Sequence, residues 1–132
     1  HSILKKIRGF EKIHQWAGLH HEKLNGSGYP FGYDKDDLCI GSRIMCISDI
    51  FTALTEDRPY RKGLSEIDSV KIMLKMVNGN EIDRDIFYTL FENYQSINQG
   101  REYVQNMKEI EYREFDKRIR GNIIERSPKT II

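Results

Sequence analysis

Apolar residues recur at helical spacing along most of this chain. The clearest run spans residues 40–55, where the apolar positions are three and four residues apart: Ile40, Ile44, Ile47, Phe51 and Leu54. Such spacing places these side chains on one face of a helix. The same periodicity predicts further helices over residues 11–24 and from 66 to about 77. The pattern as a whole predicts an all-α fold.

Short polar signals divide these helices from one another. Ser65, followed three residues later by Asp68, is typical of a helix start. Residues 78–80 read Asn-Gly-Asn, which is a stop signal. Asp83 is placed to cap the next helix, whose apolar positions are Ile86, Phe87, Leu90, Phe91 and Tyr94. Between residues 25 and 37, glycine and proline predict a loop.

The composition changes after Gly100. Residues 101–120 hold 11 charged side chains among 20, with a thin apolar stripe of Tyr103, Met107 and Ile110. This pattern predicts an extended, exposed helix, and residues 121–132 are predicted to form a tail. We therefore expect a helical domain over residues 1–98 and a charged helix with its tail over 99–132.

Composition excludes some classes of protein. At 132 residues, the chain is long enough for one domain. Its formal net charge of +1 gives no overall attraction to nucleic acid polymers or to membranes, and no segment is apolar enough to span a bilayer. The two cysteines, Cys39 and Cys46, do not suggest a disulfide framework. We expect reduced thiols and a cytoplasmic protein.

The strongest chemical signal is a pair of histidines, His20 and His21, just before a glycine-rich turn. Histidine is a common metal ligand. Neighbours on a helix project about 100° apart, which disfavours two facing ligands of one ion. The pair could instead serve different ions of one centre, or one histidine could bind metal while the other contacts substrate. The alternative is two partly exposed histidines near a helix end.

Asp49 stands in the middle of the predicted 40–55 helix, among apolar residues. We expect its carboxylate to lie near a buried face, where it needs a partner or a metal. An ion pair with Arg43 or another cation is the alternative to a metal.

Two loops could bind phosphate. The Gly-Ser-Gly-Tyr-Pro turn at residues 26–30 could cradle an anion with its backbone amides, and Tyr29 could stack on a base. Three cations, Arg58, Arg61 and Lys62, follow in a stiff loop, and arginine suits phosphate oxygens. The alternative for this second loop is a solvated helix end.

The order of these motifs, from His20-His21-Glu22 through Gly28-Tyr29-Pro30 to Asp49 and residues 57–61, resembles the second half of an HD-GYP domain. The resemblance covers about residues 1–91. Members of that family are helical, metal-dependent phosphohydrolases of bacterial signalling that hydrolyse cyclic di-GMP. The resemblance implies a helical bundle of the HD type, incomplete at its N-terminus.

The resemblance also implies roles for individual residues. Three match the metal ligands of the family: His20, His21 and Asp49. Five match positions that contact substrate: Gly28, Tyr29, Pro30, Arg58 and Arg61. No residue of this chain matches a separate catalytic group.

The chain departs from the family pattern in three places. No His-Asp pair occurs in the sequence, although the family carries one upstream of these motifs. Asn25 and Thr52 stand where the family commonly has aspartate. The resemblance thus implies a fragment of a phosphodiesterase that uses iron or manganese when intact. We expect the chain alone to be inactive, and it could bind no metal.

Two other functions are compatible with the sequence. A degenerate domain could use its Gly-Tyr-Pro loop to dock partner signalling domains, and the loss of a carboxylate at Thr52 favours this reading. Alternatively, the helix over residues 101–120 could join two copies of the chain into a homo-oligomer.

Overall fold

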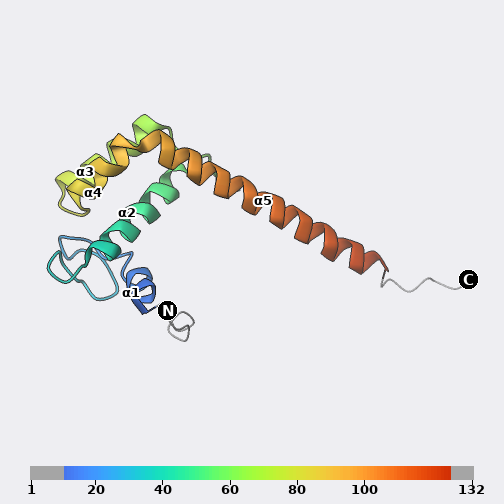
Figure 1. The fold of residues 1–132 in the computed structure, drawn as a ribbon, viewed down its shortest axis with the longest axis horizontal. Helices are drawn as coiled ribbons and strands as arrows, with labels where there is room; N and C mark the ends of the chain where they lie inside the picture. Colours follow the sequence, from blue (N-terminus) through green and yellow to red (C-terminus); the bar gives the residue numbers. More distant parts are fainter. Residues whose placement is uncertain (1–10, 126–132) are drawn as a thin grey trace, which may run out of the picture. The chain divides into compact units, whose positions relative to one another are not determined.

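The computed structural model describes residues 11–125, and the side chains of residues 12–119. Five helices occupy this range: α1 (Glu11–Gly18), α2 (Ile40–Thr55), α3 (Glu66–Asn78), α4 (Arg84–Glu92) and α5 (Tyr94–Glu125). Extended pairing among the described residues is limited to two isolated bridges, Asn25 with Asp34 and Arg58 with Arg61. The all-α prediction is confirmed (Figure 1).

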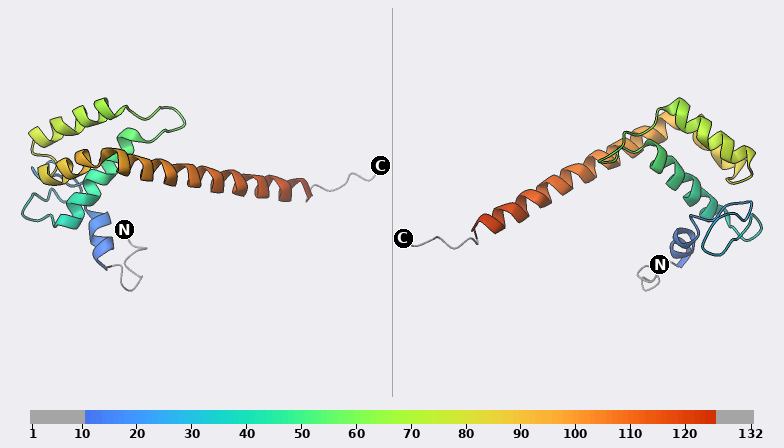
Figure 2. Two further views of the ribbon diagram at one scale, coloured as in Figure 1. Left: turned by 45° about the horizontal axis from the view of Figure 1, so that its top comes forward. Right: turned by 180° about the vertical axis from the view of Figure 1, so that it is seen from behind.

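The chain divides into two units, and the division falls between Tyr94 and Gln95. In the first unit, α2 packs against α1, α3 and α4, and α3 also packs against α4 (Figures 1 and 2). The division lies close to the predicted boundary after residue 98, which stays a prediction.

The hydrophobic core of this unit is built around α2. Its buried members are Cys46, Ile47, Phe51, Met73, Val77, Ile82, Phe87, Leu90 and Tyr94. Burying a large apolar side chain contributes about 1.5–3 kcal/mol. Because the core holds α2 in place, it also determines where the side chains on the other faces of α2 begin.

The predicted helix boundaries around α3 and α4 are confirmed. The Ser65 hydroxyl accepts the backbone N–H of Asp68 at 3.2 Å. The Asp83 carboxylate accepts the amides of Asp85 and Ile86 at 3.0 and 3.2 Å. Gly79 caps the end of α3. These caps satisfy amides and carbonyls that a helix end leaves unpaired.

The buried face of α2 differs from the predicted one in its first turns. A Cβ on Gly41 would lie 2.3 Å from the Trp16 indole, so the absence of a side chain lets α1 approach α2 closely. The buried positions there are Gly41 and its neighbour Ser42, whereas Ile40 and Ile44 are exposed. The predicted stripe is therefore wrong at Ile40 and Ile44.

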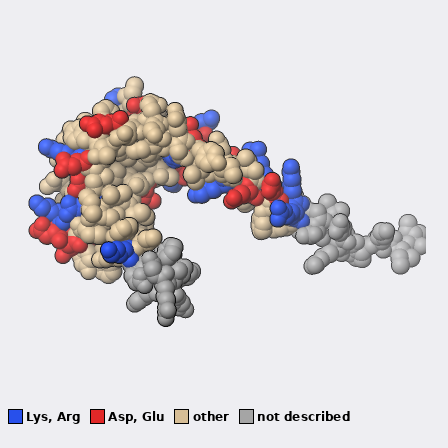
Figure 3. All heavy atoms as spheres, in the orientation of Figure 1, with Lys and Arg blue, Asp and Glu red and all other residues tan. Residues whose placement is uncertain are grey.

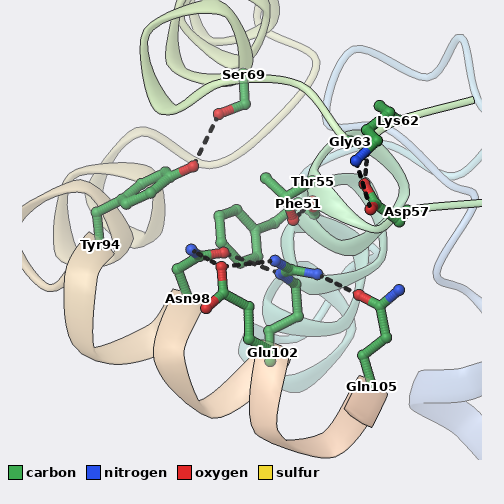
Figure 4. A network of polar contacts seen from close by, with 11 residues as sticks. Phe51, Thr55, Asp57, Lys62, Gly63, Ser69, Tyr94, Asn98, Glu102 and Gln105 are labelled. Atoms are coloured by element: carbon green, nitrogen blue, oxygen red, sulfur yellow. Dashed lines mark hydrogen bonds and ion pairs between the residues drawn. The ribbon is translucent and has the colours of Figure 1, made fainter. Parts of the chain in front are cut away.

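Tyr94 closes the first unit. Its ring meets that of Phe51 edge-on, with centroids 5.4 Å apart. Its hydroxyl lies 3.2 Å from the hydroxyl of Ser69, so a buried polar pair completes the core (Figure 4).

The described residues of the second unit form a single helix, the part of α5 after Tyr94. Most of its side chains are exposed, as predicted for residues 101–120. Lys, Arg, Asp and Glu are interspersed along it (Figure 3), and two ion pairs have i, i+4 spacing, Arg113 with Glu109 and Arg118 with Glu114. Exposed pairs of this kind contribute about 0.3–0.5 kcal/mol each.

The predicted tail begins too early. The helix continues through residues 121–125, and residues 126–132 lie outside the described range. Gly121 alone did not end the helix, because one helical glycine costs only about 1 kcal/mol. No helix in the described part of the chain is long and apolar enough to cross a membrane.

Candidate metal centre

Three side chains from two segments come together beside α2. His20 and His21 lie in the turn that follows α1, and Asp49 lies within α2. One potential ligand atom from each lies within 4.8 Å of the others. Ligands held at about 2.0–2.2 Å from one ion are at most about 4.4 Å apart. The cluster is only slightly wider than this, so its spacing and its N/O donors fit a metal ion.

The adjacent histidines can converge because they are not helical. The sequence predicted a helix through residue 24, but α1 ends at Gly18. Leu19 donates its N–H to the Trp16 carbonyl in a tight turn. The His20 and His21 ring centroids are then 3.9 Å apart. The prediction of a helix over 19–24 is wrong, and with it the expected 100° separation of the two rings.

A hydrogen bond orients the His20 ring. Nδ1 lies 2.6 Å from the carbonyl oxygen of Ala17, which can only accept, so Nδ1–H is the donor. This bond also takes the carbonyl to which His21 N–H would bond if the helix continued. Nε2 is left with its lone pair for a metal, and such backbone-anchored histidines are typical of metal sites.

Asp49 is exposed, contrary to the expected position near a buried face. The alternative partner, Arg43, pairs with Asp83 instead at 3.0 Å. Arg43 also donates to the carbonyls of Lys35 and Leu38, at 2.6 and 2.8 Å. Burial raises the pKa of Asp83, but the Arg43 hydrogen bond and the helix amides outweigh it, so the net pKa is lowered. Arg43 therefore holds the loop that precedes α2, and Asp49 faces the histidines.

The Gly-Tyr-Pro loop lies directly on the histidine turn. A Cβ on Gly28 would lie 2.5 Å from the Glu22 Cα and 2.6 Å from the His21 carbonyl oxygen. The Tyr29 ring packs against the His21 ring with centroids 4.7 Å apart, and Tyr29 N–H donates to the His21 carbonyl at 3.3 Å. The Tyr29–Pro30 peptide bond is cis. The structure thus brings Gly28, Tyr29 and Pro30 to the candidate ligands.

Backbone amides of this loop are already engaged, which argues against a phosphate cradle. Asn25 accepts the N–H of Ser27 at 3.1 Å and its hydroxyl at 2.7 Å. Gly26 N–H donates to Lys23, and Tyr29 N–H donates to His21. The Asn25 side chain thus shapes the turn, whereas the loop lacks the row of free amides that an anion nest requires.

Glu22 is the site residue that sequence reasoning missed. Its side chain is buried, at 1% exposure. One carboxylate oxygen accepts the N–H of Phe31 at 2.7 Å, and the other accepts that of Tyr33 at 3.0 Å. In the sequence, the only signal was a carboxylate beside a loop whose amides lack helical partners. A solvent-exposed glutamate at the same position would look identical in the sequence.

The basic loop contacts the far end of α2. Arg61 donates from its guanidinium to the Ala53 carbonyl. Ala53 is one helical turn beyond Asp49, about 6 Å along the axis. Arg58 is exposed, and its backbone pairs with that of Arg61. Arg61 is thus positioned on the face of α2 that carries Asp49, whereas no contact with another described residue draws the Arg58 side chain there.

The rest of the basic loop is shaped by one carboxylate. Asp57 accepts the N–H of Gly63 at 2.7 Å and lies 4.0 Å from the Lys62 ammonium (Figure 4). A Cβ on Gly63 would lie 2.0 Å from the Thr55 carbonyl oxygen, so glycine is required for the loop to return to α2.

The two thiols should differ sharply in reactivity. Cys46 is buried, and burial together with the Asp49 charge raises its pKa to about 11. Cys39 is exposed, and hydrogen bonds from Ser42 lower its pKa. Because the thiolate is the reactive form, we expect a disulfide reagent at pH 8 to label one thiol quickly and the second only after denaturation. Cys39→Ser should abolish the fast phase, and two fast thiols in the native chain would contradict the assigned burial.

Comparison with known proteins places these motifs in a family. The family model described as HD domain matches residues 1–86. The chain is 39% identical over 92 residues to a 3'3'-cGAMP-specific phosphodiesterase of Vibrio cholerae, covering 70% of this chain and 21% of that protein. It is 35% identical over 68 residues to a cyclic di-GMP phosphodiesterase of Pseudomonas aeruginosa, covering 52% and 16%.

A third relative matches a shorter stretch of the chain. A cyclic di-GMP phosphodiesterase of Thermotoga maritima is 40% identical over 45 residues, covering 34% of this chain and 12% of that protein. The matched region thus spans about a fifth or less of the length of these curated relatives. From the family match and these relatives, the chain belongs to the HD-domain family, in its HD-GYP branch.

Proposed function

We propose that this chain forms the metal-binding and loop half of a phosphodiesterase that hydrolyses a cyclic dinucleotide. The observation that carries the proposal is the convergence of His20, His21 and Asp49 within 4.8 Å. The relatives named as cyclic di-GMP and 3'3'-cGAMP phosphodiesterases support the class of substrate.

The three candidate ligands among the described residues are too few for a centre of two or three ions. We propose that further ligands come from residues outside this chain, and that the ions are iron or manganese, which accept imidazole and carboxylate ligands. Such ions would supply positive charge against the phosphate and lower the pKa of a water molecule.

The side chains have distinct tasks in this proposal. His20 and His21 offer neutral nitrogen, and Asp49 adds the negative charge that balances a divalent ion. Arg61 supplies a cation about one turn along α2 for a phosphate oxygen. Tyr29 covers one face of His21 and limits the directions from which substrate and water can enter.

The proposed reaction is hydrolysis of a 3′–5′ phosphodiester. Water forms a bond to phosphorus while the bond from phosphorus to the 3′ oxygen breaks, and that oxygen takes up a proton. One ring opening gives a linear dinucleotide, and a second hydrolysis gives mononucleotides.

Turnover of cyclic di-GMP and 3'3'-cGAMP with added Mn²⁺ or Fe²⁺ tests the proposal. We expect no turnover by the chain alone and metal-dependent turnover by a longer chain that contains it. Turnover by a monomer of this chain alone would refute the need for further ligands. A longer chain without turnover in any divalent metal would refute the enzymatic function.

A docking module is the second candidate, favoured by three exposed aromatic side chains in one loop. Tyr29, Phe31 and Tyr33 are 61%, 58% and 38% exposed, and the last two rings stack with centroids 5.1 Å apart. Solvent-exposed aromatic groups are typical of protein interfaces. Capture of a signalling domain that is lost with Tyr29→Ala but kept with His21→Ala would support docking. Equal loss with both variants would contradict it.

A further inference from the structure

Glu22 is buried without a cation bonded to its carboxylate within the described part of the chain. The residue is 1% exposed, and both carboxylate oxygens accept backbone N–H groups, those of Phe31 and Tyr33. Burying a carboxylate is costly unless it is well hydrogen-bonded, and charge-assisted bonds from amides offset much of that cost. Two such bonds to residues nine and eleven positions away close the loop.

The backbone of Glu22 is fixed from the other side. Its carbonyl lies 3.5 Å from the Cys46 sulfur on α2, within reach of the thiol hydrogen. Two residues later, Leu24 N–H donates to the Glu81 carbonyl at 2.9 Å in the α3–α4 connection. Glu22 therefore joins the loop to the same helix that carries Asp49.

The loop in turn positions a candidate ligand. The Glu22 carboxylate holds the segment just after Tyr29 and Pro30, and the Tyr29 ring lies against His21 at 4.7 Å. The His20 ring also contacts the His21 ring, with centroids 3.9 Å apart. If the loop relaxed, the His21 ring would lose the contact that limits its rotation.

We infer that Glu22 is a positioning residue: its buried carboxylate fixes the loop of residues 29–33 against His21 and so preorganises the metal ligands. This inference rests on the proposed function for the role of His21 as a ligand. The hydrogen bonds by which Glu22 holds the loop do not depend on that role.

The test compares two Glu→Gln variants of this chain. Glu22→Gln removes one acceptor and places an NH₂ group opposite a backbone N–H. Glu81→Gln is the matched control, because Glu81 pairs with Lys23 at 2.6 Å in the same region and does not bond the Phe31 or Tyr33 amide. The readouts are hydrogen exchange at individual amides by NMR, and Co²⁺ titration followed by the visible spectrum.

We expect Glu22→Gln to speed exchange at the Phe31 and Tyr33 amides by at least about tenfold, while amides of α2 and α3 keep their protection. Co²⁺ should bind about tenfold more weakly, with an altered visible spectrum. Glu81→Gln should change neither loop exchange nor Co²⁺ affinity by that much. Unchanged exchange in Glu22→Gln, or equal effects in both variants, would overturn the inference.

Two further outcomes can be told apart from those above. If Glu22→Gln does not fold, Glu22→Asp takes its place: the shorter carboxylate should keep one of the two bonds, and selective exchange at one amide is the expected result. If the wild-type chain gives no Co²⁺ spectrum, the ligand role of His21 in this chain fails, and the exchange rates decide the loop role of Glu22 alone.

Discussion

Asp49→Asn will reduce phosphodiesterase turnover by more than about 100-fold in a longer chain that is active. Asparagine keeps the size of the side chain but removes the negative charge and one strong donor oxygen from the cluster with His20 and His21. Loss of groups that merely orient ligands already costs about 10–100-fold in metal affinity or activity. Losing a ligand should therefore cost more. Metal content and turnover are measured on the same samples.

The control is another exposed carboxylate. Asp36 lies in the loop before α2 and does not belong to the ligand cluster. Asp36→Asn should keep both metal and turnover within about twofold, since exposed surface substitutions have small effects. If Asp49→Asn retained full activity and full metal content, the ligand assignment would be wrong.

Gly28→Ala should be among the most damaging single changes in the first unit. Its Cβ would sit 2.5 Å from the backbone N of Lys23 and from the Cα of Glu22. These are backbone atoms, so the collision cannot be relieved by a change of rotamer, and the loop must leave the histidine turn. Overpacking typically costs 1–3 kcal/mol, and we expect a loss in the free energy of unfolding of about 3 kcal/mol. Denaturant unfolding of this chain, followed by circular dichroism, measures it.

Substitution of Gly100 should have the opposite effect on the free energy of unfolding. An added Cβ there meets no atom within 4 Å, and the residue lies inside α5. Gly100→Ala should stabilise the helix by about 1 kcal/mol, because alanine has the higher helix propensity. Equal effects of the two substitutions would show that the close approach at Gly28 does not exist in solution.

The local signals of the sequence predicted α2, α3 and α4 well. The bounds of the helix over residues 40–55 and the caps at Ser65 and Asp83 are confirmed, since each depends on residues within one or two turns. The family resemblance is confirmed too, because it rests on the order of several motifs. These features need no knowledge of what the chain packs against.

Features that depend on distant contacts were missed. The early end of α1 involves the His20 side chain, which takes up a helix carbonyl. The burial of Glu22 follows from amides nine and eleven residues away. The exposure of Ile40 and Ile44 follows from the packing of Trp16 on Gly41. Periodicity along the chain does not encode such contacts, so the loop geometry of the site could not be predicted.

Elemental analysis of bound metal shows whether His20, His21 and Asp49 belong to a metal centre. The protein is purified after growth with manganese and iron, both as this chain and as a longer chain that contains it. We expect about two or three ions per longer chain and a clear loss of metal when His20, His21 or Asp49 is replaced. A longer chain that hydrolyses cyclic dinucleotides without bound metal, or that keeps its full metal content after all three replacements, would contradict the proposed metal centre.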